Sequence, residues 1–516
     1  MKMIKSVLLI ILFSFSTCNK ERKKKVKTHD LPTHGYDFND RLLQSSTWKK
    51  MNVEFHFEHD EDVEIGKIVM IRDVIIPRLK KKLNRIFSVQ GEGVIFPFDS
   101  TRCDDDFPVP QKYKASITSA DLIIFFKLTL NTSVVINTKS CLFRADNTRP
   151  VVGRMFFSAN QVEIDYEGIA VVQDFLFSKI LQILGFSKNL FDHFDSFLPV
   201  TEVEKEFRNG ELKDVLYYIG PKGVHQARNH FNCHSLTRIR MENDLDATFG
   251  SHLEKTQFGN EMLTADLRGN KVLSAITLAI LEDSGWYKAD YTQAETLLFG
   301  RDKGCGFLEQ ECNTQFPEFC ENEGEFNCSG DYKSKSLCLK TPHSTGCFFT
   351  ELFTDLECTT RFPLFETALF EEPGAFSRCF DVLMDGKKSA GCFLSECTSK
   401  GISVRLNKSI FQCTSEDDFF RYNEMTVMCP NYVDFCGKYN EGCPYECHGV
   451  GKCLVNGTCE CDYLFSGDTC ENFHGCDFNE PLCFLLNIRE DDTEAGVKGI
   501  AKPQPINLVR KDKNKE

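Results

Sequence analysis

Cysteine is the residue type that most constrains how this chain can fold. The 516-residue sequence contains 25 cysteines, and most of them lie from Cys305 onward. Cys18 falls at the expected end of an N-terminal leader, so removing the leader leaves 24 of the 25, an even number available for pairing. Such a density is typical of proteins that fold in an oxidising compartment, so we expect disulfides to hold the second half together.

The N-terminus has the layout of a secretory signal peptide. Lys2 and Lys5 precede an apolar run at residues 7–15, and the small residues of "SFST" follow. An apolar run of about ten residues is too short to span a bilayer. The chain ends in the polar sequence "RKDKNKE". We therefore expect a signal peptide at residues 1–18, no transmembrane segment after its cleavage, and a secreted or extracellular surface-associated product.

Charge and sequons agree with export and exclude one class of partner. The formal net charge is −14, which argues against nucleic acid because phosphate binding needs a basic face. The basic run at residues 20–27 is interpreted as a solvated linker, with docking to an acidic surface as the alternative. Four sequons compatible with N-glycosylation occur, at Asn131, Asn327, Asn407 and Asn456.

Hydrophobic periodicity predicts a mixed α+β domain before the cysteine-rich region. The sequence "NVEFHFEH" alternates apolar and polar residues as a half-buried strand does. Core strands are predicted at residues 119–130 and 151–160. Helices are predicted at residues 67–89 with a basic, exposed face, at 166–184 with Gly185 as the C-terminal cap, and at 271–286.

Six cysteines near the C-terminus have a specific spacing. Three, five, five, one and eight residues separate them, with glycines at Gly449, Gly451 and Gly467. The pattern resembles an EGF-like module at residues 441–471, serving either as a rigid spacer or as a binding unit. Glu441 is the single acidic residue just before the first cysteine, so calcium binding is not supported. The resemblance implies the pairs Cys443–Cys453, Cys447–Cys459 and Cys461–Cys470.

Longer segments carry a second resemblance. The runs "VVQDFLFSKILQILGFSKNLFDHF", "ARNHFNCHSL", "FGSHLEKTQFGNEMLTA", "LAILEDSGWYKADY" and "FGRDKGCGFLEQEC" occur in this order. Together they resemble the leishmanolysin family of secreted or surface zinc metallopeptidases over roughly residues 48–470. The resemblance implies a metzincin-like (zincin) core of two subdomains facing a cleft, followed by a disulfide-rich, loop/β-rich C-terminal region.

The resemblance also implies a division of the chain. Residues 19–47 would be a linker or the remnant of a pro-segment, and residues 48–304 the metallopeptidase-fold domain. Residues 305–440 would form the cysteine-rich C-terminal domain, and residues 472–516 a polar tail after the EGF-like module. Family disulfides are implied near Cys103 with Cys141 and Cys233 with Cys305.

The catalytic motif of the family is replaced in this sequence. In H-E-x-x-H two histidines one helical turn apart bind zinc, and the glutamate is the general base. Aligned on "LGFS", the first histidine position is Ser178, the base position is Lys179 and the second histidine position is Gln182. His252 matches the third ligand and is the single retained one. Hydroxyl and carboxamide groups are poor zinc ligands, and an ammonium cannot serve as the base, so we expect no catalytic residues and no cofactor.

Other candidate ligands are weaker. No histidine is followed directly by glutamate, so no shifted H-E-x-x-H exists. His56, in "HFEHDED", is interpreted as a surface-strand residue and His193 as a loop residue. Met262 stands one position before the family's methionine site, where Leu263 is found. "KTHD" at residues 27–30 has Lys27 where the family's latch has cysteine, and Ser178, Lys179 and Gln182 also fit a polar stripe on an amphipathic helix.

These observations favour a catalytically inactive leishmanolysin homologue that acts by binding or adhesion. Its expected partner is an extracellular protein or glycan. One alternative is an active zinc-dependent endopeptidase with non-standard ligands beside His252, in which case zinc is the cofactor. The other is a structural surface or adhesion protein dominated by its disulfide-rich tail.

Overall fold

The computed structural model describes residues 47–474, except for several short segments within that range. The predicted signal peptide, all of the predicted linker but residue 47, and the tail from residue 475 onward lie outside the described residues. The segments not described are 92–101, 105–106, 115–118, 131–134, 145–146, 163–165, 195–198, 209–210, 244–248, 266–270, 310–311, 342, 345, 360–370 and 440–442.

The N-terminal part is built on a four-stranded sheet of order β2-β6-β8-β7. Its central strand β6 is buried on both faces, which explains the unbroken apolar run of its sequence. Leu122, Ile124 and Phe126 belong to the main core, whereas Ile123 and Phe125 point into a smaller cluster on the opposite face. The strands are β2 (Val53–His59), β6 (Leu122–Thr129) and β8 (Pro150–Ser158), all parallel, and β7 (Ile136–Phe143), antiparallel to β8.

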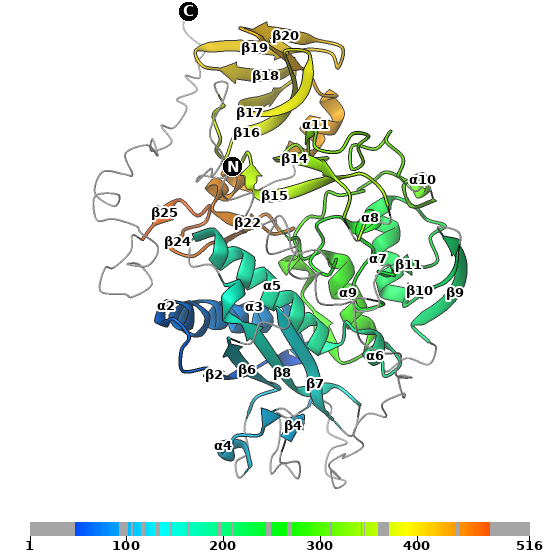
Figure 1. Cartoon of the computed structure of the whole chain (residues 1–516), viewed down its shortest axis with the longest axis vertical. Coiled ribbons are helices and arrows are strands. Elements are labelled where there is room, and N and C mark those ends of the chain that lie inside the picture. Colours follow the sequence, from blue (N-terminus) through cyan, green and yellow to red (C-terminus); the bar gives the residue numbers. More distant parts are fainter. Residues whose placement is uncertain are drawn as a thin grey trace, which may run out of the picture.

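The long helix α5 (Tyr166–Leu184) covers one face of this sheet (Figure 1). It approaches β8 closely at Gly153, where a Cβ atom would lie 2.5 Å from Cγ2 of Ile183. Ser140 of β7 donates to the carbonyl of Ile183 at 2.9 Å. Among the described residues, one helical run, Gly168–Phe191, is apolar and long enough to cross a membrane. Because 67% of its apolar window is buried inside the fold, it serves here as a core helix.

Further helices and several short strands complete this part. The helices are α2 (Ile65–Val69), η1 (Met70–Ile75), α3 (Ile76–Ile86), α4 (Gln111–Lys114) and η2 (Ala159–Gln161). The short strands β1 (Lys49–Lys50), β3 (Phe87–Val89) and β12 (Tyr287–Ala289) form a sheet of order β1-β3-β12, and β4 (Arg102–Asp104) pairs with β5 (Phe107–Pro108).

The middle part packs helices against a three-stranded sheet of order β11-β10-β9. Asp283 joins two of its helices, because its carboxylate accepts from Tyr218 Oη at 2.8 Å and from the backbone N–H of Gly223 at 2.9 Å. The strands are β9 (Thr201–Arg208), β10 (Glu211–Tyr218) and β11 (Ile239–Arg240). The helices are α6 (Lys188–Phe191), α7 (Pro221–Phe231), α8 (Lys255–Phe258), α9 (Ala275–Asp283), η3 (Tyr291–Gln293) and α10 (Cys305–Glu309).

The C-terminal part is rich in strands and disulfides, as predicted, and the α+β class of the whole chain is confirmed. A three-stranded sheet of order β13-β14-β15 lies beside a six-stranded sheet of order β19-β18-β17-β16-β21-β20. The first contains β13 (Phe326–Cys328), β14 (Ser334–Leu339) and β15 (Phe349–Glu357). The second contains β16 (Ser377–Met384), β17 (Lys387–Thr398), β18 (Gly401–Leu406), β19 (Ser409–Cys413), β20 (Phe419–Tyr422) and β21 (Met425–Met428), followed by α11 (Tyr432–Tyr439).

The six-stranded sheet curls until its two edge strands meet. The ring of Phe411 on β19 stacks on the ring of Phe420 on β20 with centroids 4.4 Å apart. The apolar residues inside the curl form their own cluster, which includes Phe380, Phe393 and Val404.

The last described segment, residues 443–474, is a small module with its own cysteine-rich core. Figure 1 shows it in orange and red beside α5, far in sequence from the elements that it contacts. Its elements are η4 (Pro444–Gly449), β22 (Gly451–Cys453), β23 (Cys459–Cys461), β24 (Phe465–Ser466) and β25 (Asn472–Phe473). We call residues 443–474 the cysteine module.

Disulfides hold the second half together. The cysteine module contains Cys443–Cys453, Cys447–Cys459 and Cys461–Cys470, the pairs that the resemblance to an EGF-like module implied. Cys141 is disulfide-bonded, but the side chain of Cys103 lies outside the described residues, so their pairing stays a prediction. The other described bridges are Cys233–Cys305, Cys312–Cys347, Cys320–Cys338, Cys328–Cys379, Cys358–Cys392, Cys397–Cys436 and Cys413–Cys429.

Two predicted helices have the wrong bounds. The helix predicted at 67–89 begins at Ile65, changes to a π-helical turn before Pro77, and ends at Ile86. Pro77 lacks an N–H, so it cannot donate the hydrogen bond that would continue the α-helix from the preceding turn. Phe87–Val89 is extended because β3 pairs with β1 and β12. The helix predicted at 271–286 covers only Ala275–Asp283, because Ser274 caps its N-terminus.

Candidate functional site on helix α5

Helix α5 carries the three positions where the zinc motif would stand. Its apolar residues, such as Leu176, Ile180 and Leu184, are fully buried. The helix ends at Gly185, whose φ of 153° favours glycine. The remaining polar face presents Lys179 and Gln182 toward the segment that contains His252.

His252 is held in place by backbone pairing on both sides. Its carbonyl accepts from the N–H of Glu242 at 2.9 Å, and the next residue, Leu253, donates to the carbonyl of Leu263 at 2.9 Å. The imidazole is buried, with 8% of the residue exposed. Two segments distant in sequence therefore fix the ring opposite α5.

Two nitrogen donors of α5 meet the His252 ring. Nε2 of Gln182 lies 3.0 Å from Nε2 of His252 and donates also to the carbonyl of Ser251 at 3.0 Å. Nζ of Lys179 lies 3.4 Å from the same His252 nitrogen. Since an amide NH2 and an ammonium only donate, His252 Nε2 acts as the acceptor.

Ser178 does not join this cluster. It is buried, and its hydroxyl donates to the carbonyl of Phe175 one turn earlier, at 2.7 Å. The structure thus brings three of the four predicted positions together, Lys179, Gln182 and His252, and turns the fourth back onto its own helix.

The described residues do not fit a zinc ion at His252. Zinc–nitrogen bonds of about 2.0–2.1 Å separate two tetrahedral nitrogen ligands by about 3.3 Å and require a lone pair from each. The amide nitrogen of Gln182 offers a hydrogen instead, at 3.0 Å. Within the part of the chain that the structure describes, Cys443, Cys447 and Cys459 are the one group of potential ligands close enough to share a metal, and all three are in disulfides.

The charge at the site is positive. Burial, together with the nearby charge of Lys271, lowers the pKa of Lys179 to about 8. No described carboxylate forms an ion pair with Lys179, and its ammonium lies 5.6 Å from the centroid of the Phe175 ring. The structure places a cation where the family motif has a general base.

The segment that pairs with Leu253, the residue after His252, is apolar but contains one buried acid that the sequence reasoning missed. Met262 and Leu263 are both fully buried. The carboxylate of Glu261, the residue before them, accepts from the N–H of Leu263 at 2.6 Å, from Ser274 Oγ at 2.8 Å and from Thr277 Oγ1 at 2.5 Å. Burial raises its pKa and these donors oppose the rise. The one sequence feature that could have indicated this buried acid is its place directly before the apolar pair Met262 and Leu263.

The other histidines singled out from the sequence lie elsewhere. His56 on β2 contacts Glu58, with Nε2 and Oε1 2.9 Å apart, and packs edge-on against Tyr113. His193 follows α6 in a turn, where its carbonyl accepts from Thr148 Oγ1 at 3.0 Å. Neither belongs to a described cluster that could hold a metal.

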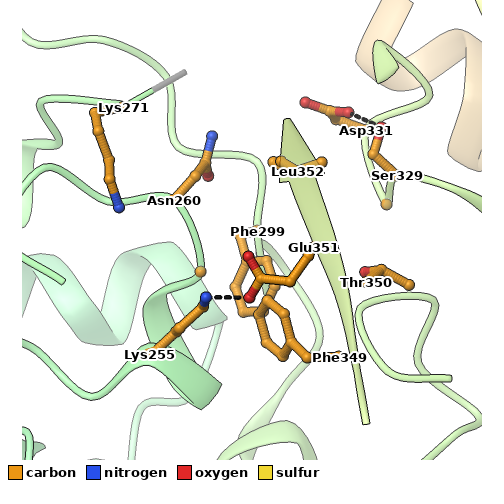
Figure 2. Close-up of a pocket in the computed structure, with 12 residues that line it drawn as sticks. Lys255, Asn260, Lys271, Phe299, Ser329, Asp331, Phe349, Thr350, Glu351 and Leu352 are labelled. Carbon is orange, nitrogen blue, oxygen red and sulfur yellow. Dashed lines mark hydrogen bonds and ion pairs between the residues drawn. The ribbon is translucent and has the colours of Figure 1, made fainter. Parts of the chain in front are cut away.

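A pocket with about 490 Å³ of space not filled by protein atoms lies between the middle part and β15 (Figure 2). Lys255 and Glu351 form a buried ion pair on its wall, above the stacked rings of Phe299 and Phe349, whose centroids are 5.3 Å apart. Lys271, the residue whose charge acts on Lys179, also lines it. Sequence reasoning did not predict this pocket, because its walls come from segments about 100 residues apart.

Comparisons with known proteins agree on one family. A family model described as leishmanolysin, of peptidase family M8, matches residues 67–346, just over half of the chain. A leishmanolysin-like peptidase of Caenorhabditis elegans is 28% identical over 205 residues, 33% of this chain and 31% of that protein. A leishmanolysin homolog of Crithidia fasciculata is 27% identical over 294 residues, 55% of this chain and 44% of that protein.

A leishmanolysin of Leishmania amazonensis gives a similar result. It is 25% identical over 285 residues, which are 54% of this chain and 46% of the relative. The chain therefore spans less than half the length of each of these three relatives.

Proposed function

Because the chain belongs to the leishmanolysin family, we propose that it is a secreted, non-catalytic member that binds an extracellular protein or glycan. The relatives are called peptidases or leishmanolysins, and their activity does not pass to this chain without the groups that perform it. The number of disulfides supports an extracellular location.

One observation carries the proposal. The Nε2 atom of His252, the atom that would hold zinc, accepts from Gln182 at 3.0 Å and faces the ammonium of Lys179 at 3.4 Å. A metal at this atom would have to displace the amide donor and stand beside a cation, which Coulomb repulsion opposes. Lys179 also lacks the carboxylate needed to take a proton from an attacking water.

The pocket beside Lys271 supports a binding role. It combines stacked aromatic rings with a small number of polar groups, as ligand sites do (Figure 2). Loss of hydrolysis leaves such a concave surface free for recognition.

The deciding experiment is metal analysis of the purified secreted chain beside a fluorogenic peptide assay. We expect no stoichiometric zinc and no chelator-sensitive cleavage. A restored variant, Ser178→His with Lys179→Glu and Gln182→His, should gain about one zinc per chain, and adding His252→Ala to that variant should remove it. Stoichiometric zinc in the natural chain, with cleavage abolished by His252→Ala alone, would instead establish an active peptidase.

The binding role needs its own test. The tagged chain should capture a specific extracellular protein or glycan, and substitution of Phe299 and Phe349 by alanine should reduce capture. A preparation with scrambled disulfides is the control. Equal capture by the scrambled control would refute binding by the folded chain.

A further inference from the structure

The hairpin formed by β22 and β23 of the cysteine module buries two side chains of opposite charge against the core. Lys452 on β22 and Glu460 on β23 are direct neighbours across the hairpin. Their side chains are only 21% and 15% exposed, although lysine and glutamate normally face water. Both point away from the module's own cysteine core and toward helices of the N-terminal part.

Lys452 is bound by three groups of the core. Its Nζ donates to Oδ2 of Asp174 on α5 at 2.6 Å and to the backbone carbonyl of Lys271 at 2.8 Å. Oε2 of Glu295 lies 3.6 Å away. Asp174 and Glu295 are themselves buried, so the ammonium supplies the charge that they need.

Glu460 meets the opposite charges on α3. Its carboxylate lies 3.0 Å from Nζ of Lys82 and 3.4 Å from Nη2 of Arg85. Lys82, which the helical pattern had placed on an exposed face, is only 5% exposed and also contacts Glu295 at 3.4 Å. The prediction of a basic, exposed face on this helix is therefore wrong at Lys82.

These contacts make one alternating cluster of three cations and three carboxylates: Lys82, Arg85, Lys452, Asp174, Glu295 and Glu460. The core's four charges and the module's two each sum to zero, but each charge of the module lies against core residues of opposite sign: Lys452 against Asp174 and Glu295, and Glu460 against Lys82 and Arg85. A surface that buries one excess acid on α5 and one excess base on α3 is complementary to this hairpin and to few others.

Main-chain contacts fix the register of the hairpin. Leu454 forms a β-bridge with Glu295, and the N–H of Val455 donates to the carbonyl of Ala294 at 2.9 Å. Arg78 of α3 donates to the carbonyl of Cys461 at 2.8 Å. All described disulfides of the module lie within it, so among the described cysteines no bridge ties the module to the core.

We infer that the cysteine module is an intramolecular ligand of the core, held non-covalently by matched buried charges on a surface formed by α3, α5 and residues 294–295. This goes beyond the proposed binding function, because it removes the hairpin face of the module from the surfaces open to a partner. It also links the module to the α5 site, since Lys452 holds the carbonyl of Lys271.

The test is a clipped form of the full chain. A flexible linker with a specific protease site is inserted between Tyr439 and Cys443, and the protein is cut after folding and secretion. The module should co-elute with the core in size-exclusion chromatography at neutral pH, although the chain between them is cut. Separation of the natural module under these conditions would overturn the inference.

A charge exchange gives the sharpest variant. Lys452→Glu with Glu460→Lys keeps the composition and net charge of the hairpin but sets like charges against Asp174 and Lys82, so the cut module should separate. The control exchanges two exposed residues, Lys408→Glu with Glu424→Lys, and should leave the module bound. Mapping the three module disulfides by mass spectrometry without reduction shows whether the exchanged module has folded. A folded, exchanged module that stays bound would also overturn the inference.

Discussion

Glu261 shows how a single buried acid can join the segment that pairs with Leu253 to the start of α9. It is fully buried and accepts hydrogen bonds from the main chain of Leu263 and Ser274 and from the hydroxyls of Ser274 and Thr277. All of these groups donate to the carboxylate and so offset part of the cost of burying it, while burial still raises its pKa. The segment under His252 and the start of α9 are thus tied to one side chain.

We expect Glu261→Gln to lower the free energy of unfolding by about 2 kcal/mol, because the amide NH2 would face donors. Chemical denaturation followed by fluorescence measures the loss. Glu323→Gln, at an exposed position, is the matched control and should change little. Equal stability of the Glu261 variant and the natural chain would show that these hydrogen bonds contribute nothing net.

Glu460 predicts a pH dependence. Burial favours its neutral form, but Lys82, Arg85 and Lys452 outweigh burial and lower its pKa from 4.5 to about 2. A carboxyl whose pKa is lower in the folded state stabilises the fold above its unfolded pKa, and this contribution is lost as the pH falls from about 4.5 toward 2.

The natural chain should therefore exceed Glu460→Gln in unfolding free energy by about 2–3 kcal/mol at pH 7, and the difference should shrink below pH 4.5. Denaturation at pH 7, 5 and 3 measures it. Glu424→Gln, an exposed change, controls for the general effect of acid. A difference that stays constant down to pH 3 would contradict the lowered pKa.

Residue identities at the α5 site could be read from the sequence, but their contacts could not. The replacement of the motif at Lys179 and Gln182 was visible because the family resemblance, aligned on "LGFS", assigns the motif to these positions. That Ser178 turns back to Phe175, and that Lys82 is buried, depend on partners elsewhere in the fold. Lys82 owes its burial to Glu460, 378 residues away, which no local pattern encodes.

At the scale of elements, the end of α5 is set by Gly185. Its φ is 153°, and an added Cβ would lie 3.2 Å from Cζ3 of Trp286. Gly185→Ala should cost about 1–3 kcal/mol, measured by thermal or chemical unfolding. Gly306→Ala in α10, where a Cβ would meet nothing within 4 Å, is the control and should be neutral or slightly stabilising. A Gly185 variant as stable as the Gly306 variant would refute the constraint.

Elements with strong local signals were predicted well. The bounds of α5 agree with the sequence, and the strands β2, β6 and β8 lie within a few residues of their predicted places. The ends of two helices were wrong because non-local pairing of Phe87–Val89 and the Ser274 cap overrode apolar periodicity. The curled six-stranded sheet was not predicted, since the cysteine pattern of this region shows density but not strand order.

At the scale of the whole molecule, the proposed secretion predicts which asparagines carry glycans. Asn407 and Asn456 are exposed, whereas Asn327 is 8% exposed and its side-chain amide donates to the carbonyl of Glu325. A secreted preparation should carry glycans at Asn407 or Asn456 and none at Asn327, because a buried amide leaves no room for a sugar. Site mapping by mass spectrometry tests this, with a preparation from cytosolic expression as control. A fully occupied Asn327 would contradict this placement.

The stacking of Phe411 on Phe420 limits how this protein can make contact with others. An open sheet invites foreign chains to add themselves as one more strand, the route by which many extracellular proteins polymerise. Here both outer strands turn toward each other and two aromatic rings fill the gap between them. A polypeptide that binds at this seam must therefore be recognised by its side chains, and the six-stranded sheet is protected there against templated fibre growth.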